Sequence, residues 1–275
     1  MTLEAIPARP VPREMLEDIY ARLNRREYVH PDPLEFLYRY DDPRDREMAG
    51  LVASSLAYGR VAQILKSVER VLERLGPRPA RFIEEARSEE LRKLFAGFRH
   101  RFTTGAEMAA MLAGAARLAE RHGSLGEAFA SFMSPGDETV MPALACFACE
   151  LSSKGGLGSC HLVPDPGRGS ACKRLLLYLR WMVRRDKVDP GGWERVSASK
   201  LVVPLDTHMF RLCRAMGLAT RRQADARAAL EATAGFRRVA PDDPVRYDFA
   251  LTRLGMNPAV EIGDFPALER ALKGA

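Results

Sequence analysis

The sequence has no run of eighteen consecutive apolar residues, which is about the shortest stretch expected of a membrane-spanning helix. Its first residues, Met1-Thr-Leu-Glu-Ala-Ile-Pro-Ala-Arg-Pro10, lack the apolar core of a signal peptide. β-branched runs are also scarce, because Leu201-Val-Val-Pro204 is too short to make a sheet. Repeats and low-complexity tracts are absent. We therefore expect an all-α, cytoplasmic protein with no membrane partner.

Cysteine is scarce, with five residues in the chain. An odd number without an export signal indicates reduced thiols rather than a disulfide framework. Cys146 and Cys149 form a C-x-x-C, and Cys160 and Cys172 follow, so a zinc or iron–sulfur site is an alternative. However, the apolar run 143–151 around the pair predicts a buried helix in which cysteine acts as a small hydrophobic residue. We expect no metal and no cofactor.

The five histidines are scattered, and none lies three or four residues from another, as metal ligands on one helix face would. The chain has 275 residues, 47% of them hydrophobic, which is enough for one large domain or two small ones with a real core. An excess of 42 basic over 36 acidic side chains gives a net charge of +6. This charge suits a polyanionic partner, although many basic soluble proteins bind no nucleic acid.

Helical periodicity dominates the chain. It predicts helices at about 13–25, 41–58 and 61–75, four or so more between residues 80 and 150 with no strand among them, and one that opens after Ser170 and carries Lys173 in its first turn. Behind Asp206, apolar residues recur at i, i+3, i+4 and i+7, and Gly217 supplies a C-terminal stop. Asp206 stands where the N-cap of this helix belongs, and Ser170 stands where the N-cap of the helix that carries Lys173 belongs.

Two motifs carry a resemblance. Asp206-Thr-His-Met-Phe-Arg211 resembles the Asp-Thr-His-x-Phe-Arg segment of endonuclease III, a member of the helix-hairpin-helix (HhH-GPD) DNA glycosylase superfamily. Upstream, Pro166-Gly-Arg-Gly169 before a helix with an early lysine is similar to that superfamily's hairpin and catalytic lysine, although Lys173 follows the glycine at a longer offset. The whole chain also resembles a bacterial family of unknown function, which we place beside those glycosylases.

The resemblance implies a nucleophile, Lys173, and a carboxylate, Asp206. Cleavage of a glycosidic bond places positive charge on the sugar, which a carboxylate stabilises while an amine attacks the anomeric carbon. The amine must be neutral to attack, so Lys173 must be partly desolvated. The helix N-terminus, the charge of Arg174 and burial would all disfavour the protonated form of this amine. Without catalysis, Lys173 would be a surface lysine and Asp206 a plain N-cap.

The resemblance also implies contacts to DNA. Glycines at a helix start let backbone N–H groups approach a phosphate, and arginines and lysines can flank it, although a solvated charged face explains each cation equally well. The expected phosphate contacts are Gly167, Arg168, Gly169, Ser170, Arg180, Arg184 and Lys200.

An enzyme that acts on a base inside a duplex must flip it out, stack it and fill the hole. Tyr58, Arg60 and Gln63 stand where endonuclease III carries its hole-filling residue, although the same stretch can be an ordinary helix junction. We expect Trp193 to stack on the base. His208 would orient the start of its helix, and Asp248 would reach the pocket from a C-terminal helix.

The sequence thus predicts two helical subdomains with the active-site cleft between them: residues 46–203 as a barrel-like half with the hairpin, and 1–45 plus 204–275 as the other. The expected function is a DNA glycosylase with abasic-site lyase activity, acting as a monomer on double-stranded DNA with a damaged base. The long interval between Lys173 and Asp206 resembles that of archaeal 8-oxoguanine glycosylases, which favours oxidised guanine. The alternatives are a non-catalytic helix-hairpin-helix DNA-binding module, or a glycosylase-fold enzyme acting on another nucleobase or on RNA.

Overall fold

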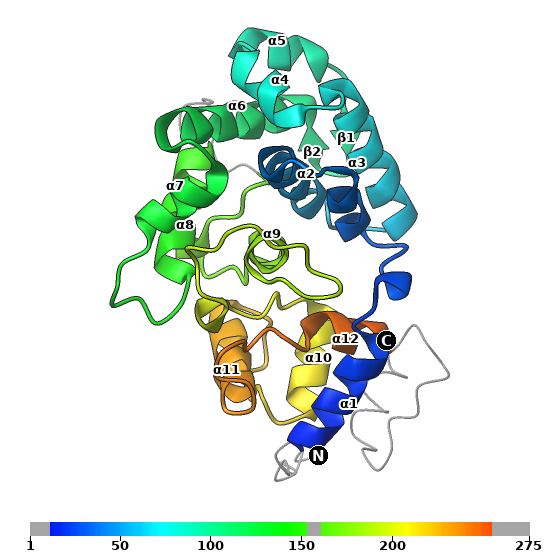
Figure 1. Cartoon of the computed structure of the whole chain (residues 1–275), viewed down its shortest axis with the longest axis vertical. Helices are drawn as coiled ribbons and strands as arrows, with labels where there is room; N and C mark the ends of the chain where they lie inside the picture. The colour runs from blue at the N-terminus through cyan, green and yellow to red at the C-terminus, as the bar shows by residue number, and fades with distance from the viewer. Residues whose placement is uncertain (1–11, 153–160, 255–275) are drawn as a thin grey trace.

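The computed structural model describes residues 12–152 and 161–254, and over these ranges the predicted all-α fold is confirmed (Figure 1). The helices are α1 Arg13–Leu23, α2 Pro43–Ser55, α3 Val61–Leu75, α4 Pro79–Glu85, α5 Ser88–Leu94, α6 Gly105–His122, α7 Leu125–Phe132, α8 Met141–Ser152, α9 Lys173–Val183, α10 Thr207–Ala215, α11 Ala226–Arg237 and α12 Asp248–Leu254. Short 3-10 helices lie at η1 Arg26–Tyr28, η2 Pro33–Arg39, η3 Pro166–Arg168 and η4 Ala198–Lys200.

The prediction of no strand between residues 80 and 150 was wrong in one place. Two residues on each side of a turn pair as antiparallel strands, β1 Arg99–His100 and β2 Thr103–Thr104. A two-residue strand is too short to show alternation, so no periodicity could reveal it.

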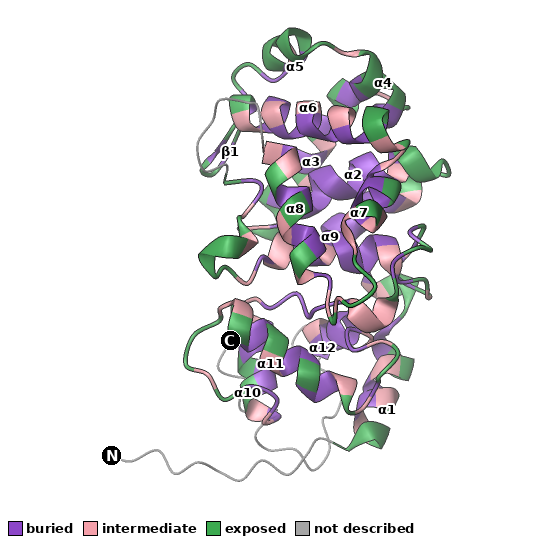
Figure 2. Cartoon of the chain, turned by 90° about the vertical axis from the view of Figure 1, so that its left-hand side faces the viewer, coloured by how far each residue is buried: buried purple, intermediate pink, exposed green. Residues whose placement is uncertain are grey.

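Helices α2 and α9 form the centre of the molecule, and Figure 2 shows both largely in the colour of buried residues. α2 packs on α9, α3, α4 and α7, and α6 packs on α4, α5, α7 and α8. The small residues of α2 permit this closeness: a Cβ added at Gly50 would lie 3.1 Å from a ring carbon of Tyr178 in α9. The N-terminus of α2 is set by Asp42, whose carboxylate accepts the Arg44 N–H at 2.8 Å, with Pro43 in the first turn.

An aromatic cluster fills the space between α7, α8 and α9. Trp193 stacks on Phe129 with ring centroids 5.6 Å apart and meets Tyr178 edge-on at 5.1 Å. Its indole N–H donates to Glu47 of α2 at 2.7 Å. Glu47 also accepts the Leu125 N–H at the start of α7 at 3.0 Å. Burial raises the pKa of Glu47 above its usual value, and these donors oppose the rise. The carboxylate thus ties three elements together.

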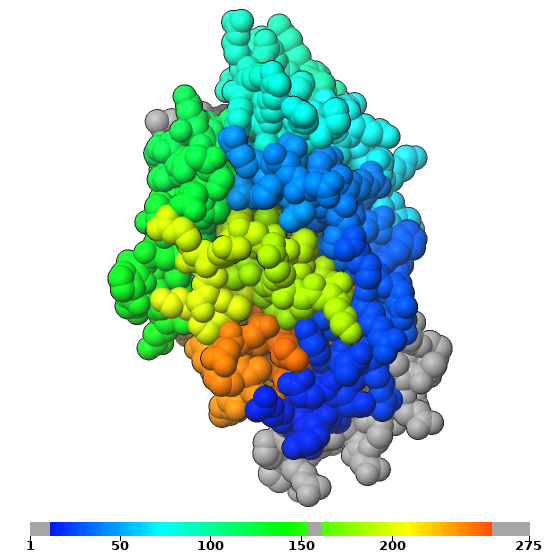
Figure 3. All heavy atoms as spheres, viewed as in Figure 1, coloured from blue at the N-terminus to red at the C-terminus, as the bar shows by residue number. Residues whose placement is uncertain are grey.

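The second group of helices comprises α1, α10, α11 and α12, at the lower end of Figure 1. α1 packs on α12, and α10 packs on both α11 and α12. Figure 3 shows the blue atoms of the N-terminal arm beside the orange atoms near the C-terminal end of the described chain. η2, by contrast, packs on α2 and α3 although it also belongs to the N-terminal arm. The predicted division at residues 45/46 and 203/204 stays a prediction.

Over the described ranges, no helix combines the length and the apolar character needed to span a bilayer.

Candidate functional site

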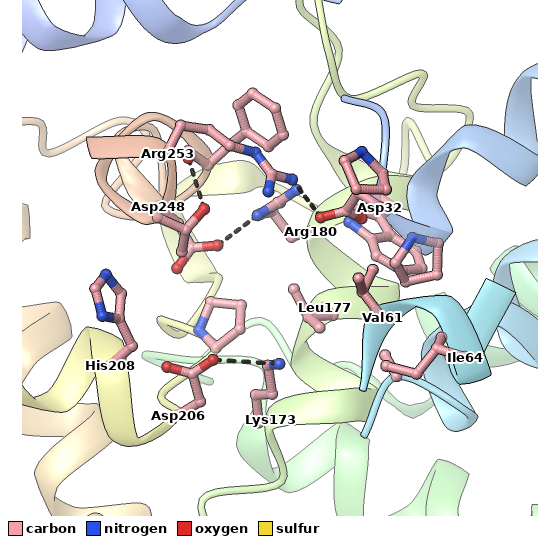
Figure 4. A pocket seen from close by; sticks show the side chains of 17 residues that line it. Asp32, Val61, Ile64, Lys173, Leu177, Arg180, Asp206, His208, Asp248 and Arg253 are labelled. Atoms are coloured by element: carbon pink, nitrogen blue, oxygen red, sulfur yellow. Dashed lines mark hydrogen bonds and ion pairs between the residues drawn. The ribbon is translucent and has the colours of Figure 1, made fainter. Parts of the chain in front are cut away.

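The two predicted catalytic side chains lie side by side. Lys173 is the first residue of α9, and Asp206 is the N-cap of α10, where its carboxylate accepts the Met209 N–H at 2.8 Å. Lys173 Nζ lies 3.3 Å from Asp206 Oδ2 (Figure 4). The side chains are 31% and 36% exposed, so both are partly withdrawn from water while remaining reachable. The N-cap position predicted for Asp206 is confirmed.

Both residues line a cavity of about 290 Å³ bordered by α3, α9, the start of α10 and α12. Figure 4 shows Lys173 and Leu177 of α9 on one side of it and Asp206 and His208 near the start of α10 on the other. α3 contributes Val61 and Ile64, and α12 contributes Asp248, Phe249, Thr252 and Arg253. Small-molecule pockets occupy roughly 300 to 1,000 Å³, so the cavity suits one small ring system.

The pKa of Asp206 falls below its usual value. Burial pushes this pKa upward, but the Lys173 ammonium and the Met209 N–H stabilise the carboxylate and outweigh it. Asp206 is therefore an anion at neutral pH and lies beside the Lys173 side chain. Such a negative charge can stabilise positive charge that develops on a bound molecule.

Two further ion pairs line the cavity. Arg180 of α9 pairs with Asp248 of α12, and Arg253 pairs with Asp32. Burial raises the pKa of Asp248, and Arg180 opposes the rise. Asp248 Oδ1 is buried and has no hydrogen-bond partner among the described residues, and the same is true of His208 Nε2. Two side chains of the lining thus carry buried polar atoms with unused hydrogen-bonding capacity.

Arg180 and Arg184 were predicted to contact phosphate, but both are buried. Their side chains are 4% and 3% exposed. Arg180 pairs with Asp189 at 3.1 Å, and Arg184 with Asp243 at 2.9 Å and also with Asp189. Buried guanidinium groups held by carboxylates cannot reach a phosphate, so these two predictions were wrong. The acids come from the loop after α9 and from the segment before α12, which periodicity in α9 could not show.

The hairpin turn, residues 166–170, is largely exposed on the surface, but three of its N–H groups are already bonded to Asp165 or Pro166. Gly167 N–H donates to Asp165 Oδ1 at 2.8 Å, and those of Arg168 and Gly169 donate to backbone carbonyls at 3.2 Å. Only Gly169 of the two glycines needs the left-handed region, with φ at 77°. Ser170 does not cap α9, because Cys172 holds that place with φ at 47°. The predicted phosphate contacts of this turn stay predictions, and its side chains, such as that of Arg168, are exposed.

The three wedge candidates lie near the cavity without lining it. Tyr58 is engaged elsewhere: its hydroxyl bonds to the His100 carbonyl at 2.8 Å and to Thr103 Oγ1 at 2.7 Å. Arg60 and Gln63 are exposed at the start of α3. From this stretch, the cavity is lined by Ala57 and Val61.

Trp193 and Lys200 are not at the cavity. Trp193 is 4% exposed in the aromatic cluster described above, so its assignment as the base-stacking residue was wrong. The aromatic rings that line the cavity are instead Trp181 of α9 and Phe249 of α12. Lys200 donates to the Pro135 carbonyl at 3.4 Å and lies outside the lining.

The cysteines differ from expectation. Cys146 and Cys149 lie on the exposed side of α8, although the sequence predicted that this segment buries them. Cys172 is buried, and burial raises the pKa of its thiol. Cys160 lies outside the described residues. Within those residues, no group of three or more His, Cys, Asp or Glu side chains could hold a metal ion.

Sequence reasoning missed Asp32 and Arg253, which lie at opposite ends of the chain and meet at the cavity. Pairing of residues so distant in sequence leaves no local signal. Asp32 did carry a weak one, because Asp before Pro is typical of a helix start, and its carboxylate accepts the Leu34 N–H at 3.0 Å.

The geometry defines a helical protein with a lysine–aspartate pair in an interhelical cavity. The chain belongs to the family described as "Protein of unknown function (DUF2400)", which matches residues 32–257. No curated protein and no solved structure matches the chain.

Proposed function

We propose that this protein is a DNA base-excision glycosylase with associated abasic-site lyase activity. The observation that carries the proposal is the Lys173–Asp206 pair, 3.3 Å apart at two helix starts in the lining of one cavity. An amine and a carboxylate in contact are the two groups that cleavage of a glycosidic bond through an amine adduct needs.

The proposed chemistry assigns a separate task to each group. The Lys173 amine, after giving up one proton, attacks the anomeric carbon as the bond to the base breaks, and the base departs with the bonding electrons and takes up a proton. The first lysine proton leaves to water, and Asp206, as an anion, stabilises the positive charge that develops on the sugar. Once the carbon–nitrogen bond has formed, Asp206 lies within reach to accept the proton of the new ammonium group and pass it to the ring oxygen. Ring opening gives a Schiff base, and loss of the proton at C2′ expels the 3′ phosphate, which cleaves the strand.

The cavity supports a flipped base as its occupant. Trp181 and Phe249 supply apolar ring faces in its lining. The unpartnered Asp248 Oδ1 can accept an N–H from the edge of a base, which a lactam base such as oxidised guanine presents. Several bases present such an N–H, so we place oxidised guanine first because of the long interval between Lys173 and Asp206.

The test is a panel of duplexes, each with one damaged base or an abasic site, incubated with the protein and read for strand cleavage with and without alkali. A second reading is the covalent adduct trapped by borohydride. Wild type should form it, and Lys173→Gln should not, because the substitution removes the amine. Lys93→Gln is the matched control, since Lys93 lies on α5 and pairs with Glu89 at 3.5 Å.

Trapping at the wild-type level by Lys173→Gln would place the nucleophile outside the cavity, because Lys173 is the one lysine among the described residues that line it. If no damaged or abasic duplex is cleaved or trapped while duplex binding is tight, the second candidate function holds. That candidate is a non-catalytic DNA-binding module, and it is favoured by the exposed Arg168 side chain in the hairpin turn.

A further inference from the structure

Phe102 stands out on the surface. Phe102 is 69% exposed, whereas the other exposed large hydrophobic residues that the structure describes are 37% to 39% exposed. It lies in the turn between β1 and β2, and its only described ring neighbour is His161, with centroids 5.7 Å apart. An apolar ring held out in water contributes nothing to the core and is accessible to a partner.

The turn that presents Phe102 is also unusual. His100 pairs with Thr103, which leaves a two-residue connection, Arg101 and Phe102. Such connections favour Asn-Gly or Asp-Gly because of the left-handed conformation they require. Here Arg101 adopts φ of 52°, which is costly for a residue with a Cβ. Strained backbone of this kind persists where the surroundings enforce it, and it is enriched at functional positions.

The surroundings of the turn are rigid. Tyr58 at the end of α2 bonds to both strands through its hydroxyl. His100 is fully buried, with ring nitrogens bonded to Ser67 Oγ at 2.9 Å and the Tyr58 carbonyl at 3.0 Å. Phe102 is therefore held out on a fixed support, which lowers the entropy cost of binding through it.

Cations without acidic partners lie on the turn, on β1 and on α3, which packs against β1. Arg60, Arg70, Arg99 and Arg101 make no ion pair with a carboxylate among the described residues. Surface cations of α4 and α5 differ, since Arg81 pairs with Glu85 at 2.8 Å and Lys93 with Glu89 at 3.5 Å. The Arg101 guanidinium lies 5.6 Å from the Phe102 ring centroid. An aromatic ring among unpaired arginines is the combination that binds a nucleic-acid strand.

The turn adjoins the candidate site. A Cβ at Gly59 would lie 2.8 Å from the Arg101 side chain, and Ala57, two residues earlier, lines the cavity. The guanidinium of Arg174, next to Lys173 in α9, lies 4.8 Å from the Tyr58 ring centroid. DNA that reaches the cavity along this side would meet the turn.

We propose that Phe102 stacks on a nucleobase of the bound DNA while Arg101 contacts an adjacent phosphate. This inference rests on the DNA partner of the proposed function but not on its chemistry. It also replaces Tyr58 as the aromatic contact near the α2–α3 junction, because the Tyr58 hydroxyl is bonded inward.

Two pairs of full-length variants test it. The native tryptophans, Trp181 in the cavity lining and Trp193 in the aromatic cluster, are present in every variant, so quenching is counted only beyond that of the wild type and then reports on the tryptophan placed at 102. The fluorescence of Phe102→Trp should be quenched by a duplex containing a tetrahydrofuran abasic analogue. Phe82→Trp, at a 37% exposed site on α4, should not be quenched. Phe102→Ala should weaken binding of the same duplex about 10-fold, and Phe82→Ala should leave it unchanged.

The stacking role would be overturned by equal quenching at 102 and 82. It would also be overturned if fluorescence anisotropy shows duplex binding while 102 is not quenched. Neither result would argue against DNA as the partner. Self-association that Phe102→Ala abolishes, without quenching by DNA, would replace DNA with a second copy of the chain as the occupant. Quenching at 102 without any borohydride-trapped adduct would support stacking and count against the glycosylase chemistry alone. Absence of all duplex binding would overturn both proposals.

Discussion

The two ends of α9 carry cations in opposite settings. At its first residue, Lys173 is 31% exposed and faces one carboxylate, Asp206, across a cavity. At its far end, Arg184 is 3% exposed and held by Asp186, Asp189 and Asp243. A charge with a single partner and access to solvent can take part in chemistry, whereas a buried charge with several partners is structural. The sequence alone, which shows only cations along a helix face, does not separate the two.

The structural end also positions the reactive end. The Tyr20 hydroxyl of α1 donates to Asp186 at 3.0 Å, and Arg180 pairs with Asp248 of α12. The buried network therefore attaches α1 and α12 to α9. Because α10 packs on α12, the network also sets how close Asp206 of α10 comes to Lys173 of α9.

The largest effect is expected from breaking the network. Asp189→Ala removes a fully buried carboxylate and leaves Arg180 and Arg184 without one of their partners. Losing one member of a buried ion pair costs about 3–5 kcal/mol, so the free energy of unfolding measured in urea should fall by about that amount. Asp18→Ala is the control, because Asp18 and Arg22 form an exposed pair worth about 0–1 kcal/mol. Equal losses would show that the network is not structural.

At the reactive end, Asp206→Asn should slow base release by about 10²–10³-fold, the usual effect of removing one group that stabilises transition-state charge. The amide oxygen can still accept the Met209 N–H, so the fold should survive, as circular dichroism would show. Asp42→Asn makes the same change at the N-cap of α2, away from the cavity lining, and should leave base release unchanged. Similar rates for wild type and Asp206→Asn would assign Asp206 to capping alone.

The pH dependence of stability gives a second test of the Lys173–Asp206 pair. Because the pKa of Asp206 is lowered from 3.8 in the folded protein, its charged form stabilises the fold at pH above about 3.8. That contribution is lost as the pH falls through the folded pKa. The difference in melting temperature between wild type and Asp206→Asn should thus be constant near neutral pH and shrink below pH 3.8. In a Lys173→Gln background the difference should be smaller throughout, since Lys173 is the main group that lowers the pKa of Asp206.

Local signals predicted the parts of the structure that are local. α3 begins and ends at the predicted residues, Val61 and Leu75, because Ile64, Val68 and Leu72 recur at helical spacing and Gly76 follows. Asp206 caps α10 because an aspartate before an amphipathic helix bonds to an N–H three residues on. These features need only a few neighbouring residues.

Features that join distant segments were not predictable. Trp193 is buried because Glu47, far earlier in the chain, accepts its indole N–H. Arg184 is buried because Asp243 comes from the segment before α12. The Arg101–Phe102 turn was missed for another reason: neither residue is typical of a turn, so strain enforced by tertiary contacts is invisible in local preference.

The smallest effect expected concerns salt. Each phosphate contact adds about 0.9 to the slope of log affinity against log salt concentration, so duplex affinity should fall steeply with added salt. Arg101→Gln should reduce that slope by about one contact, because Arg101 has no carboxylate partner among the described residues. Arg81→Gln should leave it unchanged, since Arg81 pairs with Glu85 on α4. Equal slopes for wild type and Arg101→Gln would remove the phosphate contact from the turn, and a flat salt dependence of the wild type would argue against a DNA partner altogether. Arg184 offers no comparable test, because its substitution would disturb the network that holds the cavity in place.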